Sequence, residues 1–90
     1  MNERKAYVAF LIDGAAEELG GAFNLFIRNK DDDAYFYAKS IDAEGNYFQL
    51  VVDQEILPGT AIELELQIPH EFVKGVFCGE YRDIHELGYF

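Results

Sequence analysis

The chain has 90 residues, of which 17 are acidic and 7 are basic, and its formal net charge is −10. This charge excludes the usual nucleic-acid binders, which neutralise phosphates with clustered lysine and arginine, and it disfavours docking on an anionic membrane surface. Half of the residues are hydrophobic and 16% are aromatic, which excludes a disordered acidic tail and predicts a single folded domain over residues 1–90.

An apolar run over residues 6–12 opens the chain. The apolar spacing fits one helix through residue 19, but that helix would carry basic residues at its positive end and acidic residues at its negative end. The sequence therefore favours a strand over 6–12 and a short helix over 14–19, with Asp13 as its N-cap and Gly20 at its end. A single helix stays open as the alternative.

The same run is far shorter than the ~20 residues that span a bilayer, so no membrane contact is expected. Cys78 is the only cysteine and cannot form an internal disulfide, which predicts a cytoplasmic protein. We expect its thiol to be buried in a strand and inert.

Alternation of polar and apolar residues predicts strands along the rest of the chain. They cover residues 22–28, 34–41, 46–52, 60–68 and 72–81, with a short closing strand at 88–90. Turn residues at 29–33 and 42–45 predict two hairpins. The clearest strand is 60–68, because apolar residues alternate there with acidic or amide residues between two prolines. The prediction is an all-β fold: a small antiparallel barrel or sandwich of six to seven strands, with one short helix near the N-terminus.

The second half of the chain carries its turns and strands in a characteristic order. They are Ser40-Ile41-Asp42-Ala43-Glu44-Gly45, then Ile56-Leu57-Pro58-Gly59-Thr60, then a strand ending at Ile68-Pro69, and finally Gly88-Tyr89-Phe90. Together they resemble the second half of a PilZ domain. PilZ domains are six-stranded bacterial β-barrels, and many bind cyclic di-GMP. Their signature is an Arg-x-x-x-Arg segment followed later by an Asp/Asn-x-Ser-x-x-Gly turn.

In this resemblance Gly45 takes the glycine position, Asp42 the serine position and Ser40 the Asp/Asn position. Arg4 is followed four residues later by Val8 and not by a second arginine. The resemblance implies Arg4, Ser40, Asp42 and Gly45 as ligand-binding candidates. Arginine binds phosphate through a planar fork of donors, so the missing partner disfavours cyclic di-GMP binding.

Aromatic residues cluster around the predicted hairpin. If Phe36 and Phe48 point inward, alternation turns Tyr35, Tyr37 and Tyr47 outward, where they could form a protein-binding patch. Cross-strand aromatic pairing is the alternative explanation.

No nucleophile elbow, phosphate loop, dinucleotide fingerprint or metal-ligand spacing occurs, so neither an enzyme nor a cofactor or metal is expected. The first hypothesis is a non-catalytic bacterial PilZ-like regulatory or adaptor module that binds a protein partner without nucleotide. The alternatives are a divergent cyclic di-GMP receptor and an acidic inhibitor or nucleic-acid mimic.

Overall fold

The computed structural model describes the backbone of residues 4–90 and the side chains of residues 4–53 and 57–90. Its strands are β1 (Lys5–Leu11), β2 (Ile27–Lys30), β3 (Asp33–Ala38), β4 (Ser40–Asp42), β5 (Phe48–Leu57), β6 (Thr60–Ile68) and β7 (Val73–Glu80). Its helices are α1 (Ala15–Leu19), α2 (Gly21–Asn24), α3 (Tyr81–Glu86) and a short 3-10 helix, η1 (His70–Phe72).

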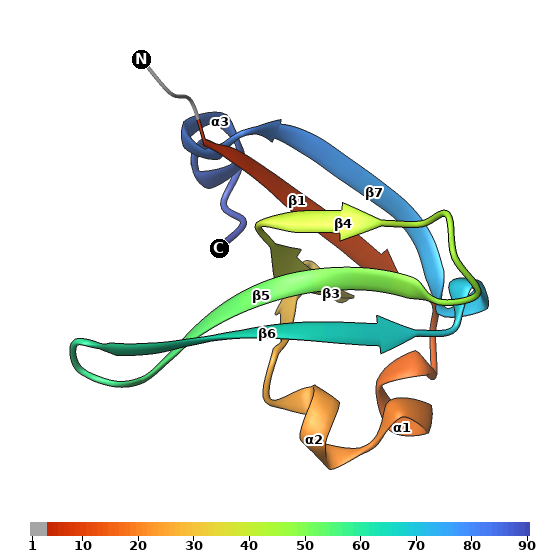
Figure 1. Ribbon diagram of the computed structural model, residues 1–90. Helices are drawn as coiled ribbons and strands as arrows, with labels where there is room; N and C mark the ends of the chain where they lie inside the picture. The colour runs from red at the N-terminus through yellow and green to blue at the C-terminus, as the bar shows by residue number, and fades with distance from the viewer. Residues whose placement is uncertain (1–3) are drawn as a thin grey trace.

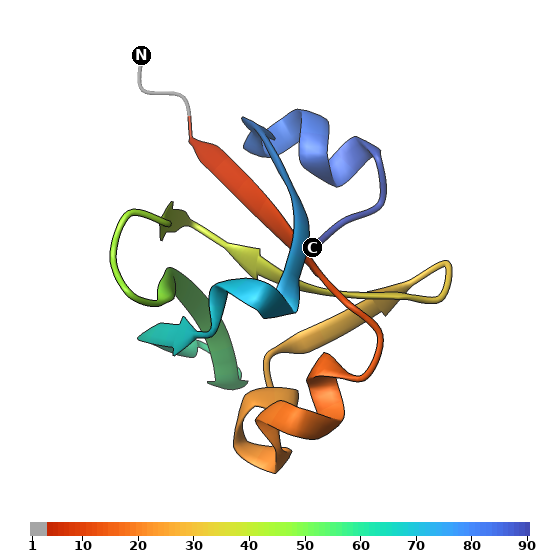
Figure 2. The same cartoon turned by 90° about the vertical axis from the view of Figure 1, so that its right-hand side faces the viewer.

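The strands form two antiparallel sheets (Figure 1). The four-stranded sheet has the order β2-β3-β1-β7, and the three-stranded sheet has the order β4-β5-β6. Helices α1 and α2 lie at one end of the molecule and α3 lies at the other (Figure 2). The mostly antiparallel β fold is confirmed, but the sheets of the described chain do not close into a barrel, and the single helix expected near the N-terminus is joined by α2 and α3.

The main core fills the space between the two sheets. Its buried members are Ala9, Leu11, Ala15, Phe36, Ala38, Phe48, Leu50, Val52 and Ile68. Each large side chain buried in this way contributes about 1.5–3 kcal/mol. A second buried cluster, Ala6, Val8, Tyr35 and Ile84, lies on the opposite face of the four-stranded sheet under α3. Because β1 contributes to both clusters, its sequence is almost continuously apolar.

The predicted strand and helix at the start of the chain are confirmed as β1 and α1, and the single-helix alternative is wrong. The helix ends at Gly20 as expected, but its N-cap is Gly14 and not Asp13. Gly14 has a φ of 85°, a left-handed conformation that glycine adopts without steric cost, and no side chain caps the helix.

Downstream, the predicted strand 60–68 coincides with β6, and 72–81 contains β7. The strand predicted over 46–52 begins at Phe48 and runs on to Leu57. Both predicted hairpin turns are present, between β2 and β3 and between β4 and β5. Pro58 and Gly59, with a φ of 80° at Gly59, make the tight turn into β6. The side chain of Ile56, part of the family resemblance, lies outside the described residues.

Of the strand predicted over 22–28, only residues 27 and 28 lie in a strand, as the start of β2, and the rest of the prediction is wrong. Residues 21–24 form α2, because Phe23 and Phe26 stand three apart and both pack on the main core, a helical spacing that alternation does not reveal. The Asn24 side-chain amide joins the two short helices by donating to the carbonyls of Ala16 (2.8 Å) and Gly20 (2.6 Å). Leu25, which the strand would have buried, is 73% exposed.

Two further predictions need correction. The strand expected over 34–41 is divided into β3 and β4, because the chain passes from one sheet to the other at Lys39, whose backbone N–H donates to the carbonyl of Val51 (2.8 Å). Residues 88–90 form no strand. Gly88, with a φ of 96°, turns the chain after α3 and brings Tyr89 back onto the four-stranded sheet.

Candidate functional site

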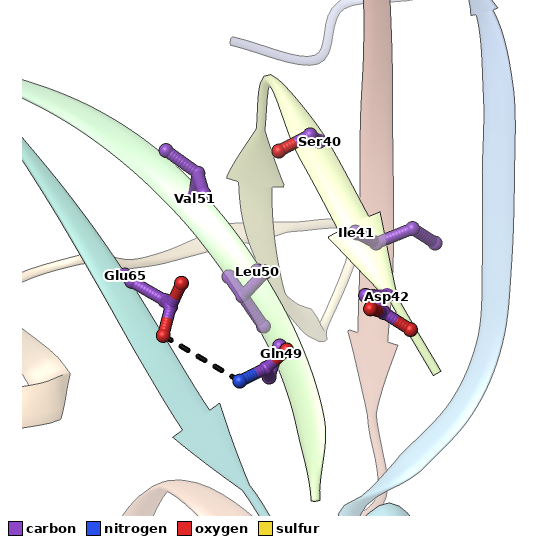
Figure 3. A pocket seen from close by; sticks show the side chains of 7 residues that line it. All are labelled: Ser40, Ile41, Asp42, Gln49, Leu50, Val51 and Glu65. Atoms are coloured by element: carbon purple, nitrogen blue, oxygen red, sulfur yellow. Dashed lines mark hydrogen bonds between the residues drawn. The ribbon is translucent and has the colours of Figure 1, made fainter. Parts of the chain in front are cut away.

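The outer face of the three-stranded sheet holds a shallow hollow of about 170 Å³ (Figure 3). It is lined by Ser40, Ile41, Asp42, Gln49, Leu50, Val51 and Glu65. The strand register pairs Ser40 with Val51 and Val51 with Glu65, so these three side chains share one face of the sheet. The hollow therefore depends on all three strands and not on one loop.

The polar groups of the hollow are mainly hydrogen-bond acceptors. Asp42 and Glu65 contribute carboxylates, and the amide of Gln49 donates to Glu65 Oε2 (3.5 Å), as does that of Gln67 (3.3 Å). Asp42 Oδ1 accepts from the backbone N–H of Glu44 (3.0 Å), which orders the turn after β4. No basic side chain is among the lining residues. This arrangement attracts an ammonium or guanidinium group and repels a phosphodiester.

The basic residue next to the hollow is already paired. Lys39 Nζ donates to Glu63 Oε2 (2.6 Å) and lies 3.8 Å from Asp53 Oδ2. The hydrogen bond from the ammonium to Glu63, and then the charge of Asp53, raise the pKa of Lys39. The lysine is thus held by carboxylates of the same sheet face, which stays acidic overall.

The residues implied by the family signature are only partly brought together. Ser40 and Asp42 line the hollow, whereas Gly45 lies in the following loop, where its carbonyl is 2.7 Å from His70 Nε2. Arg4 is not among the lining residues. Its guanidinium lies 4.5 Å from the ring centre of Tyr81, and its carbonyl accepts from the N–H of Tyr81 (2.8 Å).

The three tyrosines do not form the predicted patch. Tyr35 lies on the face of β3 opposite to Phe36, as predicted, but it is only 3% exposed and its hydroxyl donates to the carbonyl of Phe90 (3.2 Å), so the exposure predicted for it is wrong. Tyr37 is half-buried, while Tyr47 is 52% exposed in the loop before β5. Phe36 and Phe48 do point into the core, but α3 and the end of the chain also cover the other face of β3.

An aromatic cluster packs α3 and the end of the chain onto the four-stranded sheet. The rings of Tyr81 and His85 lie 4.2 Å apart, and Tyr37 and Phe90 meet His85 edge-on. This cluster was not predicted. The feature of the sequence that could have indicated it is the composition of the last ten residues, which include three aromatic residues and a histidine.

Cys78 is exposed, contrary to the prediction, because β7 is an edge strand. It faces Tyr7 across the β1–β7 pair, and its thiol raises the pKa of the Tyr7 hydroxyl. Within the part of the chain that the structure describes, no three His, Cys, Asp or Glu side chains are arranged to hold a metal ion.

Comparison of the chain with protein-family models, curated proteins and solved structures gives no significant match. None of the helices within residues 4–90 combines the length and apolar character needed to cross a membrane.

Proposed function

We propose that this chain is a non-catalytic adaptor module, PilZ-like in the order of its later turns and strands, that binds a protein partner and no nucleotide. Its contact surface is the outer face of the three-stranded sheet, and its partner presents lysine or arginine side chains. The cytoplasm is the proposed location, since the exposed thiol of Cys78 suits a reducing compartment.

The acidic hollow carries this proposal. Asp42 and Glu65 provide carboxylates beside the amide of Gln49, an acceptor set that suits a basic side chain. Tyr47, the exposed member of the three tyrosines, immediately precedes β5 and adds an aromatic group of the kind enriched in interfaces. The hollow has no arginine pair for a phosphodiester, so a cyclic di-GMP receptor is the weaker candidate.

An acidic inhibitor of a basic protein is the second candidate. The exposed carboxylates of Asp42, Asp53, Glu63 and Glu65 on one sheet face favour it. An inhibitor of this kind would bind through long-range electrostatic attraction, so its affinity would fall steeply as the salt concentration rises. An adaptor that also uses Tyr47 would lose affinity in the Tyr47→Ala variant at any salt concentration.

The first experiment is a two-dimensional amide NMR titration of the labelled protein with a short glycine-arginine peptide, and separately with cyclic di-GMP. We expect the peptide to shift resonances of Asp42, Gln49 and Glu65, and cyclic di-GMP to shift none. Glu65→Gln should weaken peptide binding by roughly threefold, the scale of an exposed ion pair.

Glu86→Gln is the matched control, because it removes the same charge from an exposed position on α3. If both variants weaken binding equally, the peptide senses only net charge and the proposed surface is wrong. Shifts at Ser40 to Gly45 with cyclic di-GMP would support the receptor alternative.

A further inference from the structure

Strand β6 has an open edge. It is the outermost strand of the three-stranded sheet and, within residues 4–90, pairs only with β5. The half of β6 nearest the Pro58–Gly59 turn extends past α2, so that the β5–β6 hairpin projects from the molecule (Figure 1). Among the described residues, no backbone group is hydrogen-bonded to the outer edge of this half.

This edge lacks most of the features by which proteins block strand addition, and the charges it carries, on Glu63 and Glu65, are all negative. Edge strands are commonly short, bulged, or interrupted by lysine or proline. β2 has four residues and β4 has three, and the pairing of β7 with β1 is irregular at Phe10 and Leu11. β6 has nine residues, contains neither lysine nor proline, and keeps a regular register with β5 from Ala61 to Ile68.

The apolar side of the projecting hairpin is also incompletely covered. Leu64 is 37% exposed, Leu57 is 64% exposed, and Ile62 is half-buried. On the other side of the same strand, Glu63 and Glu65 are exposed. A strand added here would therefore meet apolar side chains on one face and carboxylates on the other.

The charges on β6 indicate which kind of strand can pair with its open edge. Antiparallel pairing of two β6 strands around Leu64 would place Glu63 of one copy opposite Glu65 of the other, in chains that each carry a net charge of −10. Like charges directly opposite one another destabilise strand pairing. A strand with lysine or arginine at alternate positions removes this repulsion.

We infer that the open edge of β6 pairs with an extended segment of a partner protein in which basic residues alternate with apolar ones. The inference rests on the proposed function and adds the binding mode: main-chain hydrogen bonds supply part of the affinity, and alternation selects the partner. Basic side chains lie beside Glu65 and beside Glu63, where they compete with the exposed ion pair from Lys39 (2.6 Å), and apolar side chains cover Ile62 and Leu64.

Hydrogen exchange of the backbone amides tests this mode. The probe is a short peptide of alternating valine and lysine, and the readout is the exchange rate of each amide in residues 60–65. Alternate amides of β6 point to the open edge, so we expect every second one to exchange about tenfold more slowly with the peptide bound. An analogue methylated on all its backbone amides keeps the charges, but its methyl groups remove the peptide's donors and sterically block strand pairing, so it should give no protection.

Charge reversal provides a second arm. The Glu65→Lys variant should no longer bind the valine-lysine peptide and should bind a valine-glutamate peptide. The Glu86→Lys variant should bind both peptides as the parent protein does. Binding of the glycine-arginine peptide at the hollow without protection of β6 by the valine-lysine peptide would overturn strand addition and leave the proposed function standing. If neither peptide binds, both fail. If the amides of β6 are protected without any peptide, and this protection disappears when the protein is diluted, a second copy of the chain occupies the edge and the inference is wrong.

Discussion

The hydroxyl of Tyr37 is buried and has no hydrogen-bond partner among the described residues. A buried donor without a partner costs about 1–3 kcal/mol. The ring itself is held edge-on by Tyr81 and His85. Burial, followed by the neighbouring Tyr81, raises the pKa of Tyr37, while Arg4 and Arg28 lower it.

Tyr37→Phe should therefore raise the free energy of unfolding by about 1 kcal/mol at neutral pH. Above about pH 10 the unfolded chain loses the phenol proton while the folded chain keeps it, so the stability of the parent protein falls as pH rises. The Tyr37→Phe variant has no phenol at this position, so its free energy of unfolding should fall less between neutral pH and about pH 11. Urea unfolding at neutral pH and at about pH 11 measures both effects.

Tyr47→Phe is the control, because Tyr47 is exposed and should change neither value. A large loss of stability in Tyr37→Phe would mean that the hydroxyl is satisfied, for example by a buried water.

Some residues of the hollow could be predicted from the sequence and others could not. The family resemblance selected Ser40 and Asp42, and both line it. Gln49 and Glu65 were not selected as site residues, because no single strand pattern shows that β5 pairs with β6. The buried position of Tyr35 depends on α3, which lies about fifty residues further along the chain and was not expected as a helix.

At the level of single elements, the end of α3 depends on a glycine. Gly88 has a φ of 96°, its N–H donates to the carbonyl of His85 (2.9 Å), and Tyr89 N–H donates to the carbonyl of Ile84 (3.3 Å). This is the hydrogen-bond pattern of a Schellman cap. A Cβ at Gly88 would also lie 3.0 Å from Lys30 Cε.

Gly88→Ala should lower the free energy of unfolding by about 1–2 kcal/mol, the cost of a left-handed conformation for a residue with a Cβ. Thermal and urea unfolding measure this loss. Gly45→Ala is the matched control, since Gly45 has no positive φ and open space around its Cα. Equal stability of the two variants would show that the turn after α3 contributes little.

Strands with one solvent-exposed face were easier to predict than strands buried on both faces. β6 alternates over its whole length, so its bounds follow from the sequence. β1 buries both faces, so its apolar run also fitted a helix, and the strand was favoured only because the charges would oppose the dipole of one long helix. At the change of sheet, the polar residues Lys39 and Ser40 follow one another, and the core-facing positions move from Phe36 and Ala38 to Ile41. This break in alternation marks the division into β3 and β4, which the prediction of one strand over 34–41 overlooked.

For the whole molecule, the excess of acidic side chains is the dominant electrostatic feature. The ion pairs described, such as Lys74 with Asp33 (3.0 Å), are exposed and leave most carboxylates uncompensated. Self-repulsion of this kind destabilises a compact state, and salt screens it. Between about 0.01 M and about 0.15 M salt the Debye length falls from about 30 Å to about 8 Å.

We therefore expect the urea midpoint to rise over this range of sodium chloride. Asp32→Asn should be more stable than the parent in low salt, with a smaller difference in high salt, because Asp32 is exposed and asparagine tolerates its φ of 71°. Stability that decreases with salt would mean that attractive pairs outweigh repulsion.

The position of β1 between β3 and β7 has a consequence for how the chain folds during synthesis. β1 emerges from the ribosome early, and its pairing with β3 can form soon afterwards, but its other edge stays open until β7 has been made. Sheet pairing between such distant segments is slow and leaves a nascent edge exposed. The four-stranded sheet is therefore completed only after the strands of the three-stranded sheet have been synthesised, and until then one edge of β1 lacks its partner.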